Sequence, residues 1–109
     1  MASREFASGT LRDIIYNGSG TYSNNIGTEL TLSEDGNRYK FLAITCFCES
    51  ISSTKKLTIL YIVDSGVSYY NVTYNGTVNW VRCQLSGNKF TLLSSSYSSL
   101  YVGNIKGIP

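Results

Sequence analysis

Histidine is absent from this sequence, although it supports most acid–base and metal chemistry of side chains near neutral pH. Catalytic triads of the Ser-His-Asp or Cys-His kind and histidine-ligated metal sites are therefore excluded. A glycosidase needs two carboxylates that face each other across a cleft. The few Asp and Glu residues fall almost entirely at expected turns or strand ends, where carboxylates usually act as solvated turn residues. We accordingly predict a non-enzymatic protein that uses no cofactor.

Cysteine is scarce and odd in number, since the chain holds only Cys46, Cys48 and Cys83. Cys46 and Cys48 are two positions apart on one expected strand, so a disulfide between them would be strained. Cys83 lies on another expected strand and could pair with one of them if the strands stack. A zinc site needs about four ligands at defined spacing. We therefore expect no metal site, and we interpret the three cysteines as unbridged, with at least two of them buried as small hydrophobic residues.

Charge and long hydrophobic runs are also sparse. Charged residues form only 15% of the chain, and the net charge of +2 comes without a basic block, which gives no electrostatic basis for nucleic-acid binding. No run approaches the roughly 18–20 apolar residues of a membrane helix. No charged start followed by an apolar segment indicates a secretory signal. The surface must then consist largely of Ser, Thr, Asn, Gly and Tyr, as in many secreted or virion-surface β proteins.

Hydrophobic alternation with period two dominates the rest of the sequence. Residues 29–33 and 38–48 alternate in this way and are joined by the turn Glu34-Asp-Gly-Asn37. Further strands are expected at 11–16, 55–63, 67–74, 78–85, 89–94 and 100–108, with Asn75-Gly76 as the strongest hairpin turn. Seven or eight short strands, with turn signals about every 8–12 residues, predict an all-β fold.

The expected architecture is an antiparallel β-sandwich, jelly-roll-like, formed as a single domain by residues 11–109. Residues 1–10 are interpreted as a flexible lead or the end of a longer chain. In the strand at 38–48, Leu42, Ile44, Cys46 and Cys48 share one face, and the opposite face is also apolar. A strand that is apolar on both sides should be central in its sheet or lie at an interface.

The side chains that remain as candidates for ligand binding are aromatic rings, amides and hydroxyls in the C-terminal half. We select Tyr69, Tyr70, Asn75 and Tyr97 as candidate ligand-binding residues. A ring can stack on the C–H face of a sugar while neighbouring amides meet the sugar hydroxyls. The same residue types also fill cores and subunit contacts, so this interpretation stays open. Trp80 is expected to lie in the core.

The order of several segments is familiar. Ile14-Ile-Tyr-Asn-Gly-Ser19 is followed by residues 29–33, a turn into 39–44, a serine-rich late loop and the closing run Ile105-Lys-Gly-Ile108. This pattern, over about residues 11–108, resembles the small β-sandwich modules that end phage tail fibres, head fibres and related virion appendages. The resemblance rests on strand order and end motifs and includes no catalytic signature.

The resemblance implies a homotrimer on the virion surface that contacts a host cell-surface glycan or protein, together with other virion proteins. It implies receptor binding and host adhesion as the function. Two alternatives stay open. The chain could be a virion structural or decoration domain that binds only other virion proteins, or a carbohydrate-binding module attached to a bacterial surface enzyme.

Overall fold

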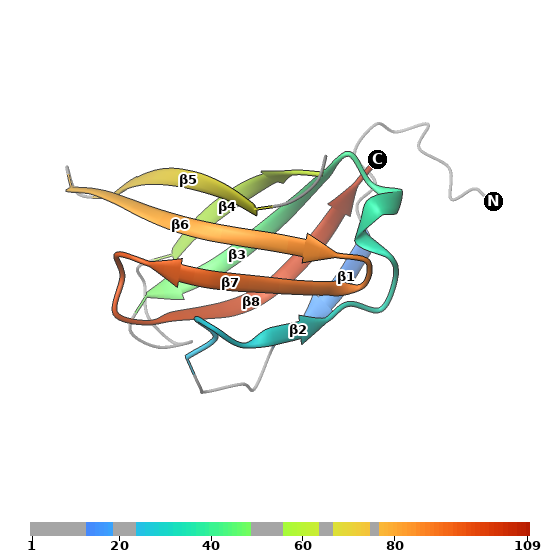
Figure 1. The fold of residues 1–109 in the computed structure, drawn as a ribbon, viewed down its shortest axis with the longest axis horizontal. Coiled ribbons are helices and arrows are strands. Elements are labelled where there is room, and N and C mark those ends of the chain that lie inside the picture. Colours follow the sequence, from blue (N-terminus) through green and yellow to red (C-terminus); the bar gives the residue numbers. More distant parts are fainter. Residues whose placement is uncertain (1–12, 19–23, 49–55, 64–66, 75–76) are drawn as a thin grey trace.

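In a computed structural model, eight strands form two four-stranded antiparallel sheets that pack face to face as a β-sandwich (Figure 1). The structure describes residues 13–18, 24–48, 56–63, 67–74 and 77–109. Within them the strands are β1 (Asp13–Asn17), β2 (Glu29–Thr31), β3 (Phe41–Cys48), β4 (Lys56–Ile62), β5 (Val67–Tyr74), β6 (Thr77–Ser86), β7 (Lys89–Ser95) and β8 (Leu100–Ile108). The predicted all-β sandwich is therefore confirmed.

The first sheet has the strand order β1-β8-β3-β4, and the second has the order β2-β7-β6-β5. Figure 1 shows the second sheet in front of the first, with their strands crossing at an angle. Each strand turns one face toward the other sheet, because successive side chains point to opposite sides of a strand. The fully buried side chains come from both sheets and include Leu42, Ile44, Tyr61, Val81, Phe90, Leu92, Val102 and Ile105.

The strand predicted to be central is central: β3 pairs with β8 on one side and β4 on the other. Leu42, Ile44, Cys46 and Cys48 are buried, while the alternate residues on its outer side are only half-buried. The backbone of β3 thus has neighbours along both edges, and its inner face supplies a large part of the core.

All three cysteines are buried free thiols, which confirms the prediction that they are unbridged and that at least two are buried. Burial raises the pKa of Cys83 to about 12. Burial, and then the neighbouring Cys83 and Cys48, raise the pKa of Cys46 further above its ordinary value. Both thiols are therefore neutral throughout the physiological range and act as small hydrophobic residues in the core.

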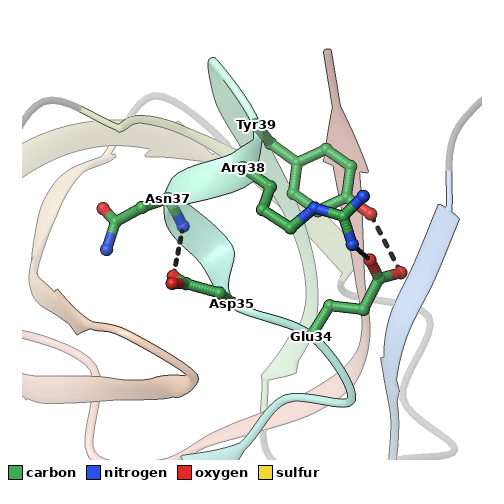
Figure 2. Close-up of polar contacts among 5 residues, drawn as sticks. All are labelled: Glu34, Asp35, Asn37, Arg38 and Tyr39. Carbon is green, nitrogen blue, oxygen red and sulfur yellow. Dashed lines mark hydrogen bonds and ion pairs between the residues drawn. The ribbon is translucent and has the colours of Figure 1, made fainter.

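The predicted turn at 34–37 is present, but the strand after it starts at Phe41, later than expected. A short 3-10 helix, Gly36–Arg38, lies between β2 and β3, and the chain passes there from the second sheet to the first. The Asp35 carboxylate accepts a hydrogen bond of 2.9 Å from the Asn37 backbone N–H and so caps the helix (Figure 2). Arg38 is the last residue of this helix and Tyr39 is its C-cap, so the ladder of β3 can begin only after them.

Glu34 contacts the last residue of this 3-10 helix and the residue that follows it (Figure 2). Its carboxylate pairs with the Arg38 guanidinium and accepts a hydrogen bond of 3.1 Å from the Tyr39 hydroxyl. The Tyr39 ring is buried and lies over Gly107 of β8. The Tyr39 ring therefore connects the segment that crosses between the sheets to the first sheet.

A polar segment before β2 is held against β8. The Asn25 side-chain oxygen accepts a hydrogen bond of 2.8 Å from the Val102 backbone N–H, and Asn25 is itself buried. Asn24 accepts a hydrogen bond of 3.0 Å from the Leu100 backbone N–H. These amides replace a neighbouring strand at the start of β8, where backbone groups would otherwise lack partners.

A turn that contains glycine joins β6 to β7. The turn after β6 is formed by Gly87 and Asn88, with Gly87 at a φ of 61°, which glycine adopts readily. The lead at residues 1–10 and the Asn75-Gly76 turn lie outside the described residues. In the described part of the chain, no helix is long and apolar enough to cross a membrane.

Candidate functional site

The outer face of the second sheet is polar and bears one exposed indole. On β6, Val81, Cys83 and Leu85 point into the core, so Trp80, Arg82, Gln84 and Ser86 point outward. The strand register extends this set across the sheet. We call it the polar face: Glu29, Thr31, Asn71, Trp80, Arg82, Gln84, Ser86, Lys89 and Thr91. Val78, two positions before Trp80 on β6, is exposed beside it on the same side of the sheet.

Trp80 lies at the centre of the candidate site. Its side chain is 37% exposed, so the expectation that it belongs to the core is wrong. The register pairs it with Asn71 of β5, which is also exposed. Residues opposite each other on one face have Cβ atoms about 5 Å apart. A flat ring and an amide group are therefore next to each other on an open surface.

The backbone of Trp80 is held by two serines, Ser95 at the end of β7 and Ser96 directly after it. The Ser96 hydroxyl accepts a hydrogen bond of 2.9 Å from the Trp80 N–H and donates one of 2.9 Å to Asn79 Oδ1. The Ser95 hydroxyl donates to the Trp80 carbonyl at 2.9 Å. Pairing of β6 with β7 is irregular between Arg82 and Cys83, and these serines restore hydrogen bonds beyond that irregularity. The indole is thus carried by an ordered backbone.

Arg82 and Gln84 continue the row that begins at Trp80. Gln84 lies opposite Thr91 of β7 in the strand register. Further along the sheet, the Lys89 ammonium donates a hydrogen bond of 2.8 Å to the Thr31 hydroxyl. Amides, hydroxyls and a guanidinium can donate to and accept from sugar hydroxyls, while the indole offers a flat apolar surface. The chemistry fits recognition of a neutral or acidic saccharide.

Two of the four residues selected from the sequence have described side chains. Tyr70 is half-buried; its ring centroid lies 5.9 Å from that of Tyr61, and its hydroxyl accepts a hydrogen bond of 2.9 Å from the Ile62 N–H. Tyr97 is half-buried in the segment between β7 and β8 and packs against the core. Tyr70 is on β5 and Tyr97 follows β7, and β6 lies between these two strands. The two rings therefore occupy different parts of the sandwich.

The other two selected residues are less fully defined. Tyr69 lies on β5 opposite Arg82, next to the Asn71–Trp80 pair along the strand register, and its side chain lies outside the described part. Asn75 lies outside the described residues altogether. Among the selected positions that the structure describes, the register places the backbone of Tyr69 beside Arg82 of the polar face.

Sequence reasoning did not identify Trp80, Asn71 or Arg82 as candidate site residues. The signal was nevertheless present: in residues 80–85, the apolar members Val81, Cys83 and Leu85 alternate with Trp80, Arg82 and Gln84. The alternation puts a tryptophan on the same side as an arginine and a glutamine, which is the side that water reaches. Large size and hydrophobicity favoured a core position for this residue, and the strand pattern outweighs both.

Among the described residues, no group of three or more His, Cys, Asp or Glu side chains could hold a metal ion. No protein-family model matches this chain, and no curated protein matches its sequence. The polar face is therefore interpreted from its own residues.

Proposed function

We propose that this chain is a non-enzymatic adhesion module of a phage virion appendage, such as a tail or head fibre, and that its polar face binds a host cell-surface glycan. The observation that carries the proposal is the exposed Trp80 beside Asn71 on the polar face. The jelly-roll-like description, the homotrimeric state and the virion-surface location are parts of the same proposal.

The contacts of such a site follow from its residue types. The Trp80 indole would stack on the C–H face of one sugar ring, and Asn71 and Arg82 would hydrogen-bond to the hydroxyls around it. An aromatic contact contributes about 0.5–1.5 kcal/mol beyond area burial. Each site would therefore bind weakly, and an oligomer would gain affinity by engaging several sugar units at once.

The test is glycan binding by single-residue variants. Trp80→Ala and Asn71→Ala should each reduce binding to an array of bacterial surface glycans, with the larger loss for Trp80. Asn37→Ala is the matched control for Asn71→Ala, because it removes an exposed amide in the 3-10 helix, outside the polar face, and it should bind like the unchanged protein. Tyr70→Phe removes only the hydroxyl that contacts the Ile62 N–H, so it should change stability more than binding.

Unchanged binding by the Trp80 and Asn71 variants, with the fold and the oligomer intact, would move the site away from the polar face. Loss of binding only on changing Asp or Glu residues outside the polar face would do the same. Absence of binding to any glycan, combined with binding to other virion proteins, would favour the virion structural or decoration alternative. Glycan binding by a protein encoded as part of a bacterial surface enzyme would favour the attached carbohydrate-binding module.

A further inference from the structure

The outer face of the first sheet carries large apolar side chains that the sandwich leaves uncovered. Ile14 of β1 is 57% exposed, and Leu60 and Ile62 of β4 are 49% and 53% exposed. On β4 the residues between them are buried, so the exposed ones point away from the core. Single exposed hydrophobic residues are ordinary, whereas a contiguous apolar patch marks a contact surface.

The strand register makes this patch contiguous. Phe41 of β3 lies between Ile62 of β4 and Ile108 of β8, which forms one apolar row across three strands. Ala43 lies beside Leu60 in the next row. Cross-strand neighbours of this kind have Cβ atoms about 5 Å apart, so their side chains touch. We call these residues, with the outward residues beside them, the apolar face: Ile14, Phe41, Ala43, Thr45, Phe47, Lys56, Thr58, Leu60, Ile62, Lys106 and Ile108. Lys106 lies between Ile14 and Ala43 in the register.

We propose that the apolar face is a self-association surface, at which copies of this chain meet one another in a dimer or a trimer. This proposal does not depend on the saccharide site, which lies on the other sheet. Two copies would pack sheet on sheet about 10 Å apart, as the two sheets within one copy already do. The first sheets of two copies are identical and so have the same twist, which makes their outer faces compatible in shape.

The size of the face supports a copy of the chain as its occupant. Four strands about 4.8 Å apart and about eight residues long give a face of roughly 20 Å by 25 Å. Two such faces in contact cover about 1,000 Å² in projection, which reaches the area expected of a biological interface. A small ligand would leave most of this surface in water. Three copies around one axis would turn the same face inward, so the measured mass distinguishes a dimer from the predicted trimer.

Two lysines on the apolar face predict how the proposed association should depend on salt. Lys106 lies opposite Ala43 and Ile14, and Lys56 lies opposite Phe47, so both lysines stand on the apolar face. No described outward position of the four strands carries an acidic side chain. Their ammonium groups can reach the rim while the stems stay on apolar neighbours. Contact between two copies opposes like charges, so added salt should strengthen it. An acidic partner would bind more weakly as salt is added.

Sedimentation equilibrium of the full chain tests the surface. At concentrations up to about 1 mM, the unchanged protein should show two or three times the monomer mass of 12.0 kDa, with tighter association in high salt. Leu60→Lys should raise the dissociation constant at least about tenfold. Ile14→Lys, at the opposite edge of the sheet, should act in the same direction. Val78→Lys is the matched control, because Val78 is 66% exposed on the second sheet, and its mass should not change.

Three results would overturn the proposal. The first is a mass of 12.0 kDa at every concentration and salt level. The second is an oligomer that Leu60→Lys and Ile14→Lys leave intact while both variants keep the native circular dichroism spectrum. The third is an oligomer that Val78→Lys dissociates as strongly as they do.

Discussion

Replacing Gly107 with alanine should destabilise this protein, because β8 passes directly beneath the ring of Tyr39. A Cβ atom at position 107 would lie 2.6 Å from each of three carbon atoms of that ring. The ring cannot move away freely, since Tyr39 is 6% exposed and its hydroxyl donates to the Glu34 carboxylate. The added methyl group must therefore displace either β8 or the Tyr39 ring, together with the crossing segment between β2 and β3 to which Tyr39 belongs.

The magnitude follows from three opposing effects. Forcing an extra carbon into a packed core costs about 1–3 kcal/mol. Pulling the Tyr39 hydroxyl from Glu34 adds roughly 1 kcal/mol. Alanine offsets up to about 1 kcal/mol by lowering the conformational entropy of the unfolded chain. The expected net loss is about 2 kcal/mol, which for a domain of this size lowers Tm by roughly 10 °C.

Urea unfolding of a double-mutant cycle tests this reasoning directly. In the Tyr39→Ala background the methyl group meets no ring, so Gly107→Ala should cost little or even stabilise the protein. Gly103→Ala is a useful comparison, because its Cβ would meet the edge of the half-buried Phe47 ring at 2.7 Å, and that ring can turn toward solvent. An equal cost of Gly107→Ala in both backgrounds would show that the Tyr39 contact is not the cause.

Further predictions concern buried polar atoms and thiols. Asn25→Ala should lower the free energy of unfolding by about 1–3 kcal/mol in urea titrations, because it leaves the buried Val102 N–H without its acceptor. Native thiol labelling should be slow and become complete only in denaturant, since all three cysteines are buried; rapid native labelling would contradict this. Because the pKa of Cys83 rises from 9.0 to about 12 in the folded state, the native protein keeps a proton that the unfolded chain releases above pH 9.0. Stability should therefore fall between pH 9.0 and about 12, by up to about 1.4 kcal/mol per pH unit for this thiol, and less steeply in Cys83→Ala.

The strands could be predicted from the sequence because alternation and turn residues are local signals. Residues 89–94 were expected to form a strand, and β7 spans Lys89–Ser95. The turn before it contains Gly87, whose positive φ costs glycine little. The central place of β3 also followed from its two apolar faces. Each of these predictions needed only a few neighbouring residues.

Long-range relations could not be predicted in the same way. Nothing local in Asn24 and Asn25 indicates that their side chains accept hydrogen bonds from the backbone of β8, more than 70 positions further along. The start of β3 was expected too early for a similar reason. The chain changes sheets at Gly36–Arg38, and that change depends on which strands β2 and β3 pair with.

The two outer faces of the sandwich together constrain how an assembly could present its binding sites. If copies meet through the apolar face around Leu60, the polar face around Trp80 must point away from the contact in every copy, because the two faces belong to opposite sheets. Self-association then leaves every proposed saccharide site accessible. The sites of one assembly would point in different directions, so they would engage separate sugar units of a branched or repeating glycan more readily than one flat epitope. Weak individual sites gain most from such an arrangement when the glycan is dense, since the effective concentration of a second site falls with its distance.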